Sequence, residues 1–177
     1  ATLCRQQGIE LAVINCGTAH SCEDLANIIH RPIMPGTADF SVQAAMSPAQ
    51  ALQALNLGKE QVERIHLSGC DFLMLGEMGI GNTSAASCLS ALLLKRDVDT
   101  LTGPGTGLEG SALAHKKAIL NTCVQRAQPL TRTPLQALEQ VGGLEIAAIS
   151  GAYIRASQLG IPCLVDGFIT TAAALLA

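Results

Sequence analysis

A single carboxylate stands inside a glycine-rich turn near the middle of the sequence. The turn reads Gly76-Glu-Met-Gly-Ile-Gly-Asn-Thr83; it follows a short apolar run and precedes an alanine- and leucine-rich segment. That order predicts a buried strand, a tight loop and the N-terminus of a helix. The first N–H groups of a helix lack intrahelical partners and the helix dipole is positive there, so this loop is suited to bind phosphate.

Two other interpretations of this loop stay open. Glycines also occur at strand-to-helix turns simply because α/β units need tight reversals. The sequence also departs from the familiar nucleotide motifs: a P-loop needs Gly-Lys-Ser/Thr where Gly81-Asn82-Thr83 stands, and the dinucleotide motif needs a third glycine where Ser84 stands. Glu77 is either a structural acid that accepts backbone N–H bonds, or an acid that faces a cationic ring or a proton donor.

A second glycine loop, Thr102-Gly-Pro-Gly-Thr-Gly107, lies downstream. It precedes a predicted helix from Glu109 to about Arg126, so the argument for phosphate applies again. Two such loops at one edge of a sheet would bind one anion better than either alone. The same helix carries Lys116 and Lys117, and most lysines on helices are simply solvated.

The first loop, from Leu75 to Thr83, closely resembles the signature of nicotinate-nucleotide:dimethylbenzimidazole phosphoribosyltransferases. The resemblance continues in the same order along nearly the whole chain. The other matching motifs are Pro35-Gly-Thr-Ala-Asp-Phe40 with Ala45-Met-Ser47, Gly103-Pro-Gly-Thr-Gly-Leu108 with Lys116, Val141-Gly-Gly-Leu-Glu-Ile-Ala-Ala148 and Val165-Asp-Gly-Phe-Ile-Thr-Thr-Ala-Ala173. Five ordered motifs are far more specific than one loop.

The resemblance implies transfer of phosphoribose from nicotinate mononucleotide to 5,6-dimethylbenzimidazole, giving α-ribazole 5′-phosphate and nicotinate for the cobalamin nucleotide loop, with no cofactor. Nicotinate leaves from a quaternary pyridinium, so no acid has to assist its departure. Benzimidazole must lose its N–H proton, which requires a carboxylate base in a dry site. Acids would stabilise positive charge on the ribose, and glycine-loop amides would bind the phosphate.

The resemblance also assigns site residues. Glu77 is expected to be a supporting catalytic acid, and Lys116 to neutralise a phosphate or carboxylate. The principal base is assigned to a later glycine-rich segment, and no residue of this sequence matches it. The residues expected to bind substrate or phosphate are Met78, Gly79, Gly81, Asn82, Thr83, Gly105, Thr106, Gly107, Lys116, Asp166 and Gly167.

Two departures from the family pattern keep other functions open. Asn15 stands where similar enzymes usually have an aspartate, and Pro104 replaces the arginine of Gly-Arg-Gly-Thr-Gly. They favour a nucleotide- or base-binding relative without catalysis. An inactive fragment of the enzyme is another alternative, because no residue of this sequence matches the expected principal base. A third hypothesis is a structural half of an oligomer, indicated by the apolar segment Phe168–Ala177. By analogy with the family, a homodimer is expected.

The predicted elements alternate between strand and helix. Apolar runs indicate strands over residues 9–15, 72–75 and 161–165, and helices are predicted over about 83–94, 109–126, 134–141, 145–159 and from 168. Ser47, Pro48 and Gln50 form a helix start, and Gly58 is predicted to break or bend that helix before a stretch whose Val62 and Ile65 face the core. This alternation predicts a three-layer, Rossmann-like α/β domain with a mostly parallel sheet, whose ligands collect at the carboxyl ends of the strands.

The composition bounds the remaining possibilities. The 177 residues form one predicted domain, and 49% hydrophobic residues are ample for a core, although only 2% are aromatic. We expect the central core of the enzyme, incomplete at both ends and lacking the small helical domain that terminal segments would form. A net charge of −3 gives no footprint for nucleic acid or an anionic membrane, and no segment is long enough to span a bilayer.

The cysteines indicate a reducing compartment. There are seven, an odd number without repeated spacing, which is typical of reduced thiols in a cytoplasmic protein. The nearest approach to a metal-binding pattern is Cys16, His20, Cys22 and His30. Its spacing matches no zinc motif, so no metal is expected.

Overall fold

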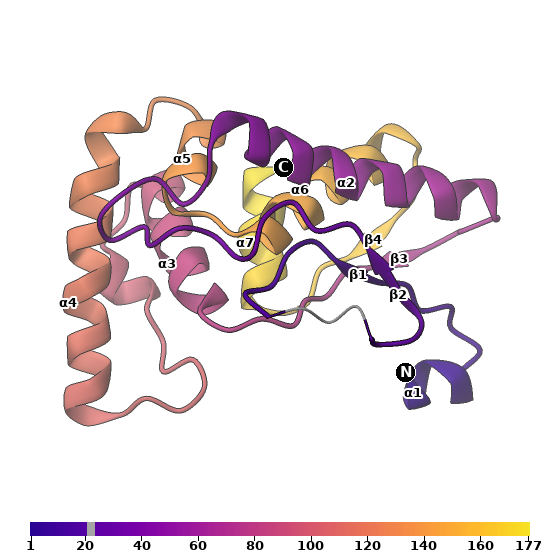
Figure 1. The fold of residues 1–177 in the computed structure, drawn as a ribbon, viewed down its shortest axis with the longest axis horizontal. Coiled ribbons are helices and arrows are strands. Elements are labelled where there is room, and N and C mark those ends of the chain that lie inside the picture. Colours follow the sequence, from indigo (N-terminus) through magenta and orange to yellow (C-terminus); the bar gives the residue numbers. More distant parts are fainter. Residues whose placement is uncertain (21–23) are drawn as a thin grey trace.

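The computed structural model describes residues 1–20 and 24–177, and helices dominate it (Figure 1). Cys22, part of the metal pattern considered above, lies outside the described residues. The elements are α1 (Thr2–Gln6), β1 (Val13–Asn15), β2 (Ile28–His30), α2 (Pro48–Leu67), β3 (Leu73–Met74), α3 (Asn82–Leu94), η1 (Val98–Leu101), α4 (Gly110–Ala127), η2 (Gln128–Leu130), α5 (Pro134–Val141), α6 (Leu144–Gln158), β4 (Cys163–Leu164) and α7 (Phe168–Leu176).

The strands are short and pair in parallel. β1 pairs with β2, and β3 pairs with β4; within the described residues these are two separate two-stranded sheets. The predicted mixed α/β class and the parallel pairing are confirmed, but the described strands do not join into one sheet. The apolar runs overstated the strands because only two or three residues of each find a hydrogen-bonding neighbour. Strand β2 was not predicted.

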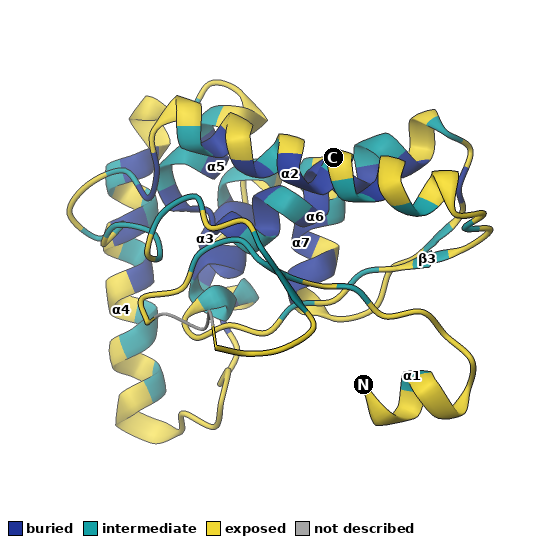
Figure 2. Ribbon diagram, turned by 45° about the vertical axis from the view of Figure 1, so that its right-hand side comes forward, coloured by how far each residue is buried: buried dark blue, intermediate teal, exposed yellow. Residues whose placement is uncertain are grey.

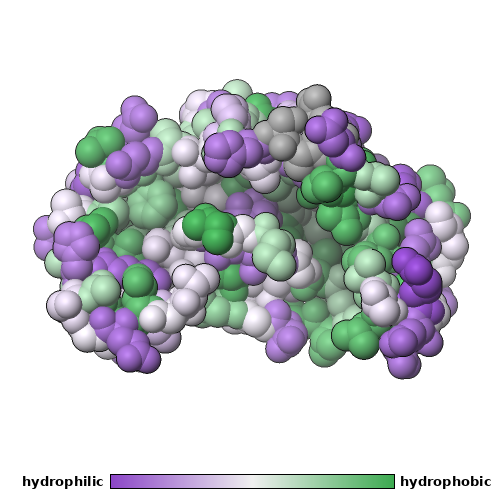
Figure 3. Space-filling view, turned by 60° about the horizontal axis from the view of Figure 1, so that its bottom comes forward, coloured by the Kyte–Doolittle hydropathy of each residue, from purple (hydrophilic) through white to green (hydrophobic). Residues whose placement is uncertain are grey.

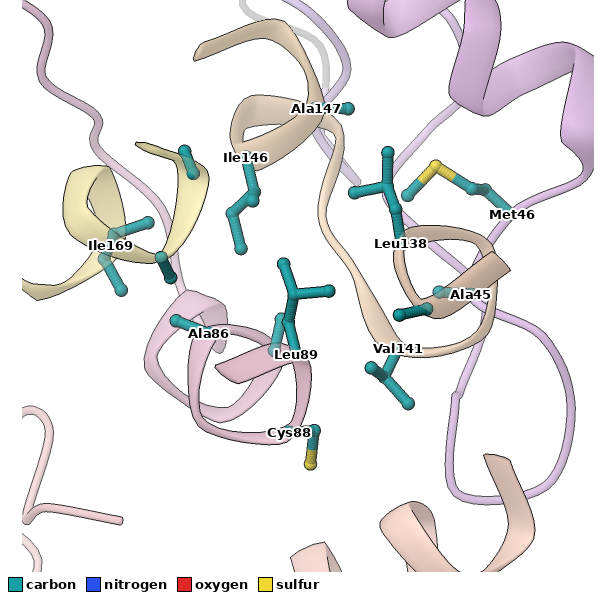
Figure 4. Packing of buried hydrophobic residues seen from close by; sticks show 14 of the residues in the cluster. Ala45, Met46, Ala86, Cys88, Leu89, Leu138, Val141, Ile146, Ala147 and Ile169 are labelled. Carbon is teal, nitrogen blue, oxygen red and sulfur yellow. The ribbon is translucent and has the colours of Figure 1, made fainter. Parts of the chain in front are cut away.

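Most helices predicted from the sequence form within a few residues of the expected bounds. Helix α3 runs through the centre of the core, and α5, α6 and α7 pack near it (Figure 2). In Figure 4, Leu89 of α3 points between Ile146 of α6 and Val141 of α5, and each of the three is fully buried. Burying one such side chain contributes about 1.5–3 kcal/mol. The core is built mainly from aliphatic residues, as the low aromatic content predicts.

Gly58 does not break its helix. The prediction was wrong because the glycine serves packing between helices rather than the end of a helix. Helix α2 runs unbroken from Pro48 to Leu67 and packs along α6. A Cβ atom at Gly58 would lie 1.8 Å from the carbonyl oxygen of Ala148, and one at Gly151 would lie 1.9 Å from that of Leu55. The two glycines therefore let the backbones approach closely. Val62 is buried as predicted.

Two helices start with side-chain caps. Ser47 and Gln50 form a reciprocal capping box at the start of α2, as predicted. At α5, Thr133 accepts a hydrogen bond from the Gln136 N–H, whereas the Gln136 side chain accepts one from the N–H of Arg132. Helices α3, α6 and α7 differ, because each has a glycine N-cap and no side-chain cap. None of the helices in the described ranges is long and apolar enough to cross a membrane.

Candidate functional site

Two loops leave the same end of the β3–β4 pair. The register pairs Met74 with Leu164 in parallel, so the loop 76–81 and the turn at Asp166 and Gly167 both follow the carboxyl ends of these strands. Ligands in α/β folds collect at such ends. Figure 3 shows a face of the molecule that is hollowed near its centre, with apolar side chains gathered beside the hollow.

The two glycine loops lie side by side at the start of α3. The Lys116 Nζ, on α4, donates to Thr83 Oγ1 at 3.2 Å and to the carbonyl oxygen of Gly103 at 3.2 Å. A Cβ atom at Gly105, where φ is +61°, would lie 3.0 Å from Thr83 Oγ1 and 3.2 Å from Lys116 Nζ. Gly81 provides no side-chain cap for the first amides of α3, and Lys116 meets Thr83 in this same first turn. This arrangement is suited to bind an anion.

Glu77 is held by the helix that follows it. Asn82, the first residue of α3, donates a side-chain hydrogen bond to the Glu77 carboxylate. Partial burial raises the pKa of Glu77 above its ordinary value. Its neighbours in the loop, Met78 and Ile80, are 98% and 97% exposed, so neither packs against the described residues. The loop thus presents one acid and two exposed apolar side chains directly before the start of α3.

Glu145 is a candidate site residue that the sequence reasoning missed. A Cβ atom at Gly143 would lie 2.6 and 2.8 Å from its two carboxylate oxygens, so the absence of a side chain there makes room for the acid. Burial raises the pKa of Glu145, and the charge of Glu77 raises it further, while the acid's own backbone N–H lowers it in part. The available signal was the acid's place in the matching Val141–Ala148 motif, where only Leu144 separates it from two glycines.

The start of α6 also reaches the carboxyl end of β1. Burial and the nearby charge of Glu145 raise the pKa of the Cys16 thiol to about 11. Leu144 lies within 3.0 Å of the position that a Cβ atom of Gly17 would occupy. The residues that follow β1 therefore lie beside the start of α6, and Glu77, in the loop after β3, is near enough for its charge to act on Glu145.

The remaining predicted residues are less directly connected. Asp166 and Gly167 accept hydrogen bonds from Thr170 Oγ1 through their carbonyl oxygens, which stabilises the first turn of α7, and the Asp166 residue is exposed. Thr106 and Gly107 are exposed in the second loop. Gly79 lies beside Asn82, where a Cβ atom would be 3.3 Å from Nδ2.

No group of three or more metal-ligating side chains occurs in the part of the chain that the structure describes. Of the pattern considered from the sequence, Cys16, His20 and His30 are described. Both ring nitrogens of His30 are buried without a hydrogen-bond partner.

A family model described as "Phosphoribosyltransferase" matches residues 1–177. The chain belongs to this phosphoribosyltransferase family. The nicotinate-nucleotide–dimethylbenzimidazole phosphoribosyltransferase of Azotobacter vinelandii is 44% identical over 178 residues, covering 100% of this chain and 51% of the relative. The enzyme of the same name from Xanthomonas campestris is 43% identical over 177 residues, again covering 100% and 51%. The family resemblance predicted from the five motifs is confirmed.

Solved structures of the phosphoribosyltransferase family have the same fold. A crystal structure of CobT from Thermus thermophilus superposes with a TM-score of 0.92 at 35% identity, over 99% of this chain and 53% of that chain. A second structure from the same organism, named as a dimethylbenzimidazole phosphoribosyltransferase, gives a TM-score of 0.89 at 34% identity. The chain spans about half the length of the relatives it matches.

Proposed function

We propose that residues 1–177 form the nucleotide-binding part of an enzyme that transfers phosphoribose from nicotinate mononucleotide to 5,6-dimethylbenzimidazole. The observation that carries this proposal is the position of Lys116. Its ammonium group connects Thr83, at the uncapped start of α3, with Gly103 in the second glycine loop. A phosphate placed there would meet a positive charge, a helix N-terminus and glycine-loop amides together.

The acids suit the other end of the same substrate. The pyridinium ring of nicotinate mononucleotide is cationic. Glu77 lies in the first glycine loop and its charge acts on the carboxyl group of Glu145, which supports a role for both acids at this end of the substrate. When the bond from ribose C1′ to the pyridinium nitrogen breaks, the ring keeps the electron pair. The new bond forms to the unprotonated benzimidazole nitrogen, and the proton on the other ring nitrogen passes to a base. In this proposal Glu77 is a supporting acid whose carboxylate stabilises the positive charge that develops on the ribose during transfer.

We also propose how the two short strand pairs fit into a longer family member. In a longer family member, the β1–β2 and β3–β4 pairs would form parts of one three-layer, Rossmann-like sheet around this central core. The 52% exposure of Met74 and 49% exposure of Leu164 support this, since apolar strand residues are ordinarily covered. We also propose a homodimer in the cytoplasm, and sedimentation velocity of the purified protein tests the dimer.

A nucleotide- or base-binding relative without catalysis is the second candidate. Asn15 favours it, because its side-chain oxygen accepts the Gly17 N–H at 2.9 Å and so serves the local turn. Pro104 favours it as well, since no guanidinium is present at that point of the second loop.

Product formation separates the two candidates. Nicotinate mononucleotide and 5,6-dimethylbenzimidazole are incubated with the chain, and in parallel with a chimaera in which the chain replaces the matching segment of the Azotobacter relative. We expect α-ribazole 5′-phosphate from the chimaera, detected by mass spectrometry. A folded chimaera that binds nicotinate mononucleotide without forming product would favour the binding protein instead.

A further inference from the structure

A buried hydroxyl connects the two glycine loops beneath the site. Ser87, on the second turn of α3, is 1% exposed. Its Oγ lies 2.8 Å from the carbonyl oxygen of Thr83 and 2.9 Å from that of Leu101. The first contact is within the helix. The second reaches a different segment, so Ser87 is a buried connection between α3 and the chain that enters the second loop.

The position of this connection matters for the geometry of the site. Leu101 directly precedes the second glycine loop, and Thr102 closes the turn before it by donating to the Val98 carbonyl oxygen at 2.6 Å. Thr83, at the other end of the Ser87 connection, is the residue whose hydroxyl meets Lys116. Two bridges therefore join the loops: Lys116 near the solvent and Ser87 in the core.

We infer that Ser87 is a positioning residue that holds the two glycine loops at the separation needed for both to contact one phosphate group. This inference rests on the proposed function. Ser87 does not touch the ligand; it acts through the backbone of Leu101 and the start of α3. Without its donor, the Leu101 carbonyl loses its connection to α3, and the second loop is no longer held in register with the first.

Ser150 provides a matched control. It is fully buried, and its Oγ lies 2.8 Å from the Ile146 carbonyl oxygen and 2.9 Å from that of Ala173. The two serines thus make the same pair of contacts in the core, one within their own helix and one to another segment. Ser150 joins α6 to α7, however, and not to a glycine loop. Removing either hydroxyl should cost similar stability, whereas only Ser87 should affect phosphate recognition.

The experiment measures affinities for nicotinate mononucleotide and for nicotinate riboside, which lacks the phosphate, by titration calorimetry on the chain. In Ser87→Ala the mononucleotide should bind about tenfold more weakly, which corresponds to the loss of about one hydrogen bond's worth of free energy. Riboside affinity should hardly change. Ser150→Ala should leave both affinities unchanged at a similar loss of thermal stability.

A second pair of variants at Ser87 keeps the test informative if Ser87→Ala does not fold. The threonine of Ser87→Thr and the valine of Ser87→Val have nearly the same shape as each other, but only threonine keeps a hydroxyl that can donate to the Leu101 carbonyl oxygen. The threonine variant should retain more of the preference for the mononucleotide than the valine variant.

The outcomes separate two failures. If wild-type chain binds mononucleotide and riboside equally, the proposed phosphate site is wrong. If the wild type prefers the mononucleotide and Ser87→Ala keeps that preference, or if Ser150→Ala loses it equally, the positioning role of Ser87 is wrong.

Discussion

Lys116 is the most important residue of the candidate site because its ammonium group contacts only neutral groups among the contacts described above. Its ammonium contacts a hydroxyl and a carbonyl oxygen, and the two ion pairs found among the described residues, Arg31–Glu60 and Arg155–Glu63, lie elsewhere. A cation without a carboxylate partner can neutralise an incoming anion at little cost in lost interactions. Lys117, next to it on α4, is the natural comparison.

Replacing Lys116 by methionine should weaken nicotinate mononucleotide binding to the chain by about 10- to 100-fold, because a charge-assisted hydrogen bond contributes about 1.5–3 kcal/mol. Lys117→Met removes the same charge one residue away and should change the affinity by less than about twofold. Titration calorimetry gives both values. Equal losses in the two variants would mean that only the net charge matters and that the loops hold no specific phosphate.

The proposed role of Glu77 is in the transfer reaction rather than in phosphate binding. Glu77→Gln keeps the shape and can still pair with Asn82, but it removes the negative charge that would stabilise the positive charge developing on the ribose. In the active chimaera, we expect kcat to fall by more than the affinity for nicotinate mononucleotide. Steady-state kinetics combined with calorimetry measures both quantities. Unchanged kcat would make Glu77 a structural acid, the alternative left open by the sequence.

Glu145 should make stability depend on pH. Since burial and the charge of Glu77 raise its pKa in the folded chain, the folded state holds the proton more tightly than the unfolded state. Its contribution to the free energy of unfolding is fully present below the ordinary pKa of 4.5 and is lost as pH rises through the raised folded pKa.

The glutamine side chain in Glu145→Gln cannot ionise, so this variant does not lose that part of the free energy of unfolding as the pH rises. We therefore compare the free energy of unfolding of Glu145→Gln with that of the wild type. The difference, variant minus wild type, should increase from about pH 4.5 upward and level off above the raised pKa of Glu145. The total increase should be about 1.4 kcal/mol for each unit by which the pKa is raised. Urea denaturation across this range provides the measurement. Glu10→Gln, at an exposed position outside the helices and strands, controls for the loss of one charge. A flat difference for Glu145→Gln would contradict a buried, proton-holding acid.

At the scale of elements, the same residue type has opposite uses. Glycine is the N-cap residue of α3, α6 and α7. The absence of a side chain leaves room for the Glu145 carboxylate at α6, and in our proposal it leaves room for phosphate at α3. Glycine in the middle of α2 and α6 lets two helices pack closely. The sequence shows a glycine in every case, but only the neighbour that packs against it distinguishes a loop, a cap and a helix crossing.

Gly58→Ala should destabilise the chain by at least about 2 kcal/mol, because the new methyl group would overlap a backbone carbonyl that cannot move aside without separating α2 from α6. Asn56→Ala, at an exposed position of the same helix, should be neutral or slightly stabilising, since alanine is the best helix former. Thermal and urea unfolding measure both changes. A neutral Gly58→Ala would show that the two helices can separate freely.

At the scale of the whole molecule, the chain carries the parts that the proposal needs for the donor nucleotide. We therefore expect nicotinate mononucleotide to stabilise it without any acceptor base. At 100 times the dissociation constant, the free energy of unfolding should rise by about 2.7 kcal/mol. Thermal denaturation with increasing ligand measures the effect, and Lys116→Met should reduce it. Equal stabilisation by nicotinate, which lacks the phosphoribose, would contradict phosphate recognition.

Local chemistry explains which elements were predictable. Ser47, Pro48 and Gln50 specify a helix start through contacts within three residues, and the position of α3 follows from a glycine turn and an apolar run. Strand pairing was less predictable. The run from Ile9 to Asn15 is apolar along its length, yet only Val13 to Asn15 pair with β2, because hydrogen bonding depends on a partner strand that the run itself does not specify.

The sequence by itself determined the family, the order of the helices and the two glycine loops, because each depends on residues that are close together in the sequence. Only the tertiary structure placed Lys116 between Thr83 and Gly103. It also brought Ser87 to the carbonyl oxygen of Leu101, before the second loop, and Glu145 near enough to Glu77 for the charge of Glu77 to raise its pKa. Those contacts join residues that are distant along the chain, and their distances follow from how α3, α4 and α6 pack. Periodicity and spacing describe a segment and its immediate neighbours, whereas the site is made where separate segments meet.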